Sequence, residues 1–86
     1  MSYQVIIPKP VQKQLDDLPD TIFKRVIQKL ETLQEEPRPQ GCLKLKGFSN
    51  EYRVRVGNYR IRYQIDDKKH LVIILICKHR RDIYRK

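Results

Sequence analysis

Apolar and basic residues alternate along residues 52–63, on both sides of the dipeptide Gly57-Asn58. Because a period of two puts successive side chains on opposite faces of a strand, this segment predicts two strands, each with one buried and one solvated face. A two-residue Gly-Asn link is typical of a type II′ turn, in which glycine takes the positive φ of the first central position. This turn predicts the register, with Val56 opposite Tyr59, Val54 opposite Ile61, Tyr52 opposite Tyr63, Arg55 opposite Arg60 and Arg53 opposite Arg62.

The predicted register places like charges directly opposite one another on the solvated face of the hairpin. Such pairs destabilise a hairpin by roughly 0.2–1 kcal/mol each. Four arginines that face one another in two pairs therefore indicate a binding site for an anionic partner.

Hydrophobic spacing predicts a strand and two helices ahead of the hairpin. Residues 3–7 predict a short first strand, which ends before a proline. Apolar residues recur at helical spacing over 11–18 and again over 22–33, so each segment predicts an amphipathic helix. We expect Asp20 or Thr21 to cap the second helix.

The segment 71–77 is apolar without alternation, which predicts a central strand that is covered on both faces. The order of elements is then β-α-α-β-β-β. The sequence predicts a single α+β domain over residues 1–86, with a mainly antiparallel sheet. Two helices should pack on one face of this sheet, and the opposite face should be basic.

Positive charge is concentrated in the second half of the chain. The formal net charge is +9. Residues 1–37 carry five basic and six acidic side chains, whereas residues 38–86 carry fourteen basic and four acidic ones. A folded half with this charge density attracts polyanions, because binding to phosphates releases their counterions.

The sequence predicts neither a metal site nor a cofactor. The two cysteines, Cys42 and Cys77, are too few for a disulfide framework, and Cys77 ends an apolar run as a core residue would. His70 and His79 have no cluster of cysteines or carboxylates around them. No run approaches the ~18 apolar residues of a membrane span. We therefore expect a reduced, cytoplasmic protein with no membrane partner.

Basic and proton-carrying residues near the hairpin and the C-terminus are the candidates for chemistry. Arginine holds a phosphate through its planar fork of donors but stays charged, so it does not act as a general base. A proton carrier must come from His79 or Tyr84. The full candidate set is Arg53, Arg55, Arg60, Arg62, His79, Arg80, Arg81 and Tyr84, with Lys44 and Lys46 nearby.

Structural roles compete with functional ones for three of these candidates. Tyr84 could simply pack near the C-terminus, and His79 could be a hydrogen-bonded residue at a strand end. For Arg62 the structural role is favoured, as a partner of Glu51, Asp66 or Asp67.

Three parts of the chain resemble the RelE toxins of bacterial toxin–antitoxin modules. They are the segment Leu45-Lys46-Gly47 with the hairpin from Tyr52 to Asp66, the ending from His79 to Arg85, and the helical opening with Leu15-Asp16-Asp17-Leu18-Pro19. The resemblance covers essentially the whole chain. The hairpin with a terminal Arg-x-x-x-Tyr is more specific to the wider RelE/ParE superfamily than to one branch of it.

The resemblance implies a metal-free endoribonuclease that enters the ribosomal A site and cuts mRNA, held inactive by an acidic RelB-like antitoxin in a hetero-oligomer. In this scheme the ribose 2′-hydroxyl attacks its own phosphate. Arg60 matches the arginine that clamps the scissile phosphate, and Arg80 or Arg81 matches the arginine on the leaving-group side. Tyr84 matches a tyrosine that stacks on a base or acts as general base. Arg53 and Arg55 stand where the family often has lysines, which leaves Tyr84 or His79 to move the proton.

Two other functions fit parts of the same pattern. A ParE-like toxin would act on DNA gyrase. Tyr84 and the arginines of the hairpin would then have no catalytic role. A non-catalytic module would bind RNA or DNA through its basic surface alone. The sequence gives neither codon preference, nor the antitoxin family and stoichiometry, nor the identity of the base.

Overall fold

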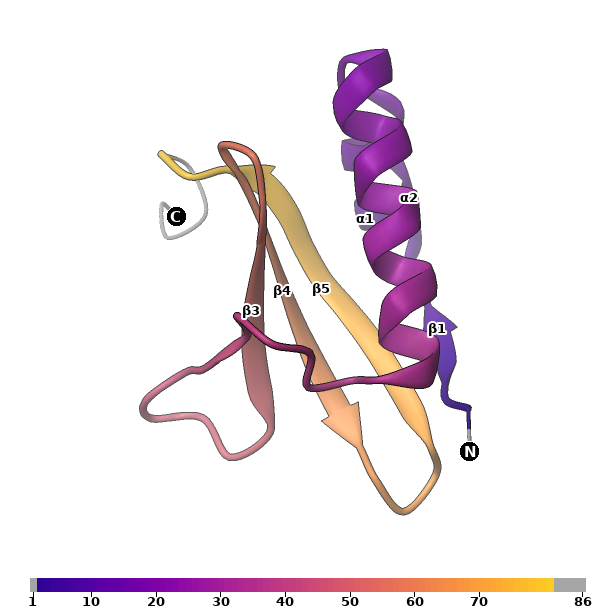
Figure 1. The fold of residues 1–86 in the computed structure, drawn as a ribbon, viewed down its shortest axis with the longest axis vertical. Helices are drawn as coiled ribbons and strands as arrows, with labels where there is room; N and C mark the ends of the chain where they lie inside the picture. The colour runs from indigo at the N-terminus through magenta and orange to yellow at the C-terminus, as the bar shows by residue number, and fades with distance from the viewer. Residues whose placement is uncertain (1, 82–86) are drawn as a thin grey trace.

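A five-stranded sheet with two helices forms the structure, a computed structural model that describes residues 2–81 (Figure 1). The strand order is β1-β5-β4-β3-β2, with β1 parallel to β5 and every other pair antiparallel. The predicted α+β class is confirmed. The elements are β1 (Gln4–Ile6), α1 (Lys9–Asp16), α2 (Asp20–Glu35), β2 (Leu43–Lys44), β3 (Glu51–Val56), β4 (Tyr59–Asp66) and β5 (Leu71–His79).

Both helices cover the same face of the sheet, as the sequence predicts (Figure 1). Helix α1 packs on β5, and α2 packs on β1 and β3. Val26 and Leu33 of α2 are fully buried in the same core cluster as Ile61 and Tyr63 of β4 and Val72 of β5. Neither helix within residues 2–81 is long and apolar enough to cross a membrane.

The hairpin of β3 and β4 has the predicted register at every pair from Tyr52 opposite Tyr63 to Val56 opposite Tyr59. Gly57 has a φ of +59°, whereas Asn58 has no positive φ, as a type II′ turn requires. Side chains on the helix side of β3 and β4 are buried, and the arginines occupy the alternate positions. The turn therefore determines which residues face one another on both sides of the hairpin.

Two local expectations about the chain were wrong. An additional strand, β2, pairs its residues Leu43 and Lys44 with β3, and a two-residue strand is too short to show a period in the sequence. Helix α2 is preceded by Pro19 at the N-cap position, with no side-chain capping bond. Asp20 is already the first helical residue. Its carboxylate does not cap the helix but interacts favourably with the positive end of the helix dipole.

Strand β5 lies inside the sheet, between β1 and β4, but the expectation that both its faces are covered was wrong. Val72, Ile74 and Cys77 are buried toward the helices, whereas Leu75 is 39% exposed. The register with β4 shifts at this point, because Arg62 pairs with Ile76 and the next residue, Tyr63, pairs with Ile74. Leu75 is thus the extra residue of a β-bulge.

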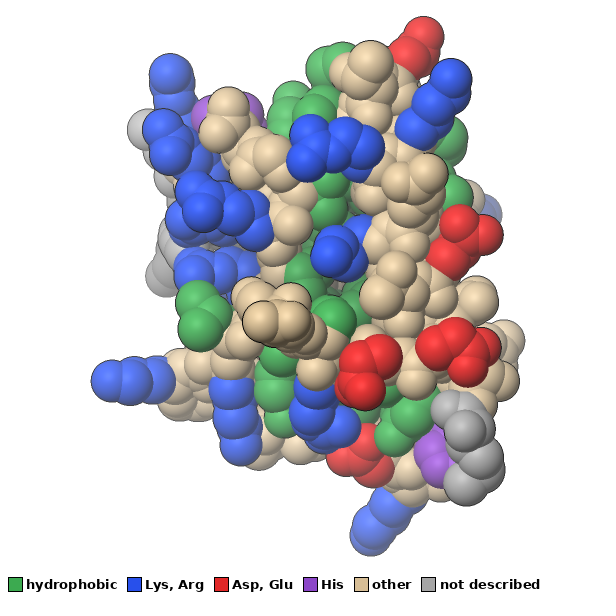
Figure 2. All heavy atoms as spheres, viewed as in Figure 1, with side chains coloured by type: hydrophobic (Ala, Val, Ile, Leu, Met, Phe, Trp, Pro, Cys, Tyr) green, Lys and Arg blue, Asp and Glu red, His purple; other side chains and the backbone are tan. Residues whose placement is uncertain are grey.

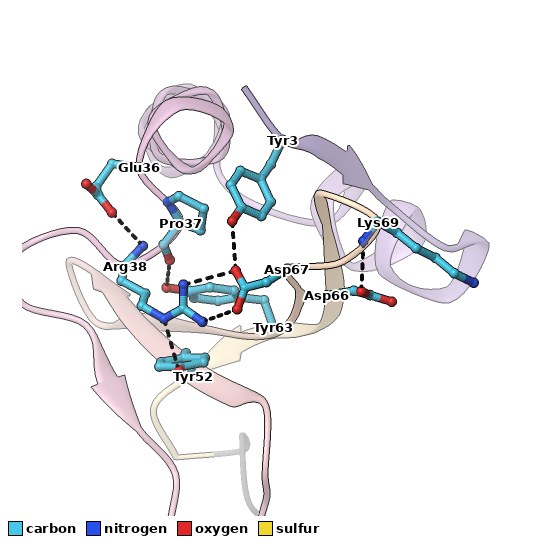
Figure 3. Close-up of polar contacts among 9 residues, drawn as sticks. All are labelled: Tyr3, Glu36, Pro37, Arg38, Tyr52, Tyr63, Asp66, Asp67 and Lys69. Carbon is cyan, nitrogen blue, oxygen red and sulfur yellow. Dashed lines mark hydrogen bonds and ion pairs between the residues drawn. The ribbon is translucent and has the colours of Figure 1, made fainter. Parts of the chain in front are cut away.

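Arg38, in the loop after α2, connects four parts of the fold (Figure 3). Its guanidinium donates to both carboxylate oxygens of Asp67, with Nη2 to Oδ2 at 2.8 Å, and its Nε donates to the Tyr52 hydroxyl at 3.1 Å. Tyr3 donates its hydroxyl to Asp67 Oδ1 at 2.7 Å. This cluster joins the N-terminal segment, the loop after α2, β3 and the turn between β4 and β5.

We predict that Asp67→Asn lowers the melting temperature at pH 7, since hydrogen bonds from Arg38 and then Tyr3 hold the pKa of Asp67 below its ordinary value. A carboxyl whose pKa is lowered by folding stabilises the fold when the pH is above its unfolded-state pKa of about 3.9. This contribution is lost as the pH falls through the folded-state pKa. The difference from wild type should therefore narrow as the pH is lowered below about 4.

Thermal melts of both proteins from pH 7 to pH 3 measure this difference. Asp16→Asn is the matched control, because Asp16 is exposed and forms no ion pair within residues 2–81. A difference that stays constant across this pH range, or an equal effect of Asp16→Asn, would contradict the role of Asp67.

Candidate functional site

A row of three basic residues crosses the sheet next to the hairpin turn. Arg55 on β3 lies opposite Arg60 on β4, and Arg60 lies opposite Lys78 on β5. Residues paired in this way have Cβ atoms about 4.5–5.5 Å apart on one face of a sheet. Arg55 is exposed, Arg60 and Lys78 are half-buried, and none of the three forms an ion pair within the described part of the chain. We call these three residues the cationic row.

Lys78 is a site residue that the sequence analysis missed. With unbroken alternation, Lys78 would share the face of Val72 and Ile74, toward the helices. The bulge at Leu75 reverses this alternation, so Cys77 is buried and Lys78 lies beside Arg60. The signal in the sequence is a basic residue directly after the apolar run, but its face depends on the bulge.

The same bulge moves His79 away from the cationic row. His79 pairs with Tyr59, and the two rings meet edge to face with centroids 5.4 Å apart. Its Nδ1 accepts a hydrogen bond from the backbone N–H of Arg81 at 3.3 Å. In the neutral ring the proton then sits on Nε2, so the nitrogen that could accept a proton is already occupied. This arrangement does not favour His79 as a general base.

Arg62 has the structural partner that the sequence analysis favours. Its Nη2 donates to Glu51 Oε1 at 2.8 Å, and both side chains are only 19% exposed. Its guanidinium also lies 5.3 Å from the centroid of the Phe48 ring. Arg53 lies opposite Arg62 and is half-buried. A role of Arg53 and Arg62 in RNA binding stays a prediction.

The remaining candidates lie around the hairpin turn and at the sheet edge. The backbone N–H of Arg80 donates to Asn58 O at 2.8 Å, which brings the segment after β5 next to the turn. Arg80 and Arg81 are both exposed. Lys44 pairs with Tyr52 and shares its face rather than that of the arginines, and Lys46 is exposed in the turn after β2. Tyr84 lies outside the described residues.

Basic side chains dominate the hairpin side of the molecule, and acidic side chains lie toward the helices and the lower end of the view (Figure 2). Within residues 2–81, no group of three or more His, Cys, Asp or Glu side chains could hold a metal ion. Cys77 is 2% exposed, and burial raises the pKa of its thiol to about 11. A buried thiol of this kind is inert.

Chemically, the cationic row provides two planar guanidinium forks and one ammonium on a solvated face. Guanidinium groups bind phosphate oxygens in pairs, and an ammonium adds a point charge with rotatable donors. The guanidinium groups of Arg55 and Arg60 stay charged and do not act as bases. The row can thus hold a phosphate and stabilise negative charge.

Comparisons with known proteins show the family to which the chain belongs. The family model described as "ParE toxin of type II toxin-antitoxin system, parDE" matches residues 5–84. RelE1 of Methanocaldococcus jannaschii is 34% identical over 88 residues, covering 99% of this chain and 98% of RelE1. Toxin RelG of Mycobacterium tuberculosis is 33% identical over 87 residues, covering all of both chains. The chain belongs to the RelE/ParE toxin superfamily.

Solved structures place the chain on the RelE side of this superfamily. The archaeal RelE–RelB complex from Pyrococcus horikoshii matches with a TM-score of 0.84 and 34% identity over the full length of both chains. The chain is therefore a RelE-type toxin of a toxin–antitoxin system, as its resemblance implies.

We predict that removing the Glu51 carboxylate destabilises this RelE-type hairpin, whereas removing the Arg55 guanidinium does not. Glu51→Gln leaves the half-buried Arg62 without its carboxylate and should lower the free energy of unfolding by about 1–3 kcal/mol. Arg55→Gln relieves repulsion from Arg60 and should be neutral or stabilising, within about 0.5–1 kcal/mol of wild type. Urea denaturation of both variants measures this difference, and equal destabilisation by the two substitutions would refute it.

Proposed function

We propose that this RelE-type toxin is a ribosome-dependent mRNA endonuclease. The observation that carries the proposal is the cationic row of Arg55, Arg60 and Lys78 on one solvated face. Like charges at this spacing destabilise the sheet, and an RNA phosphate bound among the three would reduce their mutual repulsion.

The proposed reaction is transfer of a phosphate ester within the RNA. The 2′-oxygen forms a bond to the adjacent phosphorus, and the bond from phosphorus to the 5′-oxygen breaks. The products are a 2′,3′-cyclic phosphate and a free 5′-hydroxyl. Arg60, in the middle of the row, would hold the oxygens on which negative charge develops. Arg55 and Lys78 flank it, and Arg80 or Arg81 would act on the leaving-group side.

Two protons must move in this reaction, one away from the 2′-hydroxyl and one onto the departing 5′-oxygen. Arginine does neither at working pH. The occupied Nδ1 of His79 favours Tyr84 as the group that takes the first proton. An arginine cluster near a tyrosine promotes its ionised form.

The ribosome would complete the site. The cationic row would hold a phosphate, but holding a phosphate does not by itself orient the ribose 2′-oxygen for attack. The ribosomal A site would hold the mRNA with its 2′-oxygen in line, an orientation effect that can supply several kcal/mol. Free RNA should then bind to the toxin and be cut poorly, and the place of action would be the cytoplasm.

A RelB-like antitoxin is the proposed partner that holds the toxin inactive, in a toxin–antitoxin hetero-oligomer. Relatives of this chain are known as complexes of this kind, including the RelBE2 complex of Mycobacterium tuberculosis, which matches with a TM-score of 0.80 and 28% identity over 92% of this chain and 99% of that chain. Residues 38–86 carry fourteen basic and four acidic side chains, so an acidic partner fits this half.

Inhibition of DNA gyrase is the second candidate, because the matching family model is that of ParE toxins. A gyrase inhibitor needs no group that stabilises a transition state. The two functions therefore differ in whether RNA is cut and in whether Arg60 is needed for a chemical step.

The test is single-turnover cleavage of one mRNA with and without programmed ribosomes, with both RNA ends mapped and gyrase supercoiling measured in parallel. We expect cleavage only with ribosomes, a 2′,3′-cyclic phosphate, no effect on gyrase, and loss of cleavage in folded Arg60→Ala. An RNA-only control with EDTA tests metal independence separately. Equal rates with and without ribosomes, or inhibition of gyrase without RNA cleavage, would overturn the proposal.

A further inference from the structure

An exposed aromatic ring lies on the same face of the sheet as the hairpin arginines. Phe48, in the loop between β2 and β3, is 47% exposed, and the centroid of its ring lies 5.3 Å from the Arg62 guanidinium. Arg62 alternates with the buried Ile61 and Tyr63, so Phe48 lies on the face turned away from the helices. Figure 1 shows the loop of residues 45–50 on that side of the sheet. The core on the helix side therefore does not account for this ring.

Two further hydrophobic side chains are exposed in the same part of this face. Leu43 of β2 is 53% exposed and pairs with Arg53. Leu75 is the exposed residue of the bulge in β5, which lies beside Arg62. Within residues 2–81, the one other exposed large hydrophobic side chain is Phe23 on α2. Exposed apolar surface is thus concentrated around Arg53 and Arg62.

This apolar surface lies one step along the strands from the cationic row. Arg53 comes two residues before Arg55 in β3, and Arg62 comes two residues after Arg60 in β4. With a rise of about 3.3–3.4 Å per residue, the two rows of side chains are about 7 Å apart. A phosphate held in the cationic row therefore keeps the base of an adjoining nucleotide within reach of Phe48.

The two rows differ in charge, which suits them to different parts of a nucleotide. Arg62 Nη2 donates to Glu51 Oε1 at 2.8 Å, so this guanidinium is neutralised, whereas no member of the cationic row forms an ion pair within residues 2–81. The cationic row is therefore the stronger attractor of a phosphate. The ion pair also holds the Arg62 guanidinium beside Phe48, so both groups are in place before a ligand binds.

A nucleobase matches these two groups. Bases of single-stranded RNA stack on aromatic rings and on guanidinium planes, which are the groups that Phe48 and Arg62 provide. A wholly apolar ligand would remove water from Arg62 and Glu51 without replacing its hydrogen bonds, at a cost in desolvation free energy. A base carries polar groups along its edge, so it can hydrogen-bond to charged neighbours while its ring covers Phe48.

We propose that Phe48 and Arg62 form a stacking site for a base of the mRNA, next to the phosphate that the cationic row holds. This inference rests on the proposed function, which assigns an RNA phosphate to that row. Leu43 and Leu75 border the site and shield the stacked base from water. Holding the RNA at a base and at a phosphate restricts rotation of the sugar between them, which helps to orient its 2′-oxygen.

The test measures binding of two fluorescein-labelled 2′-O-methyl RNA hexamers to the full 86-residue chain by fluorescence anisotropy. One hexamer contains only adenosine, and the other has the same sugars and phosphates but no bases. The methyl groups prevent cleavage, because the attack needs a free 2′-hydroxyl. We expect the wild-type protein to bind the adenosine hexamer at least about fivefold more tightly than the abasic hexamer.

Phe48→Ala should reduce this difference to less than about twofold by weakening only the adenosine hexamer, and Phe48→Trp should keep it, because indole also stacks on bases. The matched control is Phe23→Ala, which removes the other phenylalanine from the surface of α2 and should change neither dissociation constant. Thermal melts verify that each variant is folded. Equal weakening of both hexamers by Phe48→Ala, or an unchanged preference for the adenosine hexamer, would overturn the proposal.

Two further measurements separate this inference from its alternatives. If Phe48→Ala binds both hexamers like wild type but loses affinity for the antitoxin, the apolar surface belongs to a protein interface and the stacking site is refuted. Arg60→Ala should weaken both hexamers by a similar factor, because it removes a phosphate contact. If Arg60→Ala changes neither, the phosphate site of the proposed function fails. If the wild-type protein binds both hexamers equally and Arg60→Ala weakens both, only the stacking site fails.

Discussion

The two-residue turn at Gly57 and Asn58 determines the register on which the candidate site depends. Because Gly57 takes a φ of +59°, the strands leave the turn with Val56 opposite Tyr59, and each later pair follows from that one. A register shifted by one residue would turn every arginine of this hairpin toward the core. Burial of the Tyr63 and Ile61 side chains, both 0% exposed, therefore stabilises the position of the arginines on the opposite face.

The bulge at Leu75 is the second constraint, and it determines which residue joins the arginines from β5. One additional residue in β5 exchanges the faces of Lys78 and His79. Lys78 then completes a row with Arg60 and Arg55, while His79 packs against Tyr59. In an unbroken strand, Lys78 would face the helices together with Val72 and Ile74. Bulges are common next to functional sites because they redirect side chains in this way.

Features that depend on neighbouring residues were predictable from the sequence. The hairpin register follows from alternation and from one turn, and both helices follow from their apolar spacing, with α2 at Asp20–Glu35. A structural role for Arg62 was also foreseen, with Glu51 as one of three possible partners, and these two residues come from the two strands of the same hairpin.

Features that depend on contacts between distant segments were not predictable. The bulge in β5 is a shift in its register with β4, and no turn residue signals it. The hydrogen bonds of Arg38 with Asp67 and Tyr52 join three separate elements. A groove lies between α2 and β3 because these two elements, which are distant in the sequence, pack alongside each other. Tyr84, which the sequence analysis proposed for proton transfer, lies outside the described residues.

The central claim is that Arg60 and Lys78 act together on one phosphate. The most direct measurement is a double-mutant cycle on the single-turnover rate of ribosome-dependent mRNA cleavage, with Arg60→Ala, Lys78→Ala and the double variant, all verified as folded. Each single substitution should slow cleavage by about 100-fold or more, and the double variant should be little slower than the slower single variant. A folded Lys78→Ala that cleaves at the wild-type rate would contradict the account.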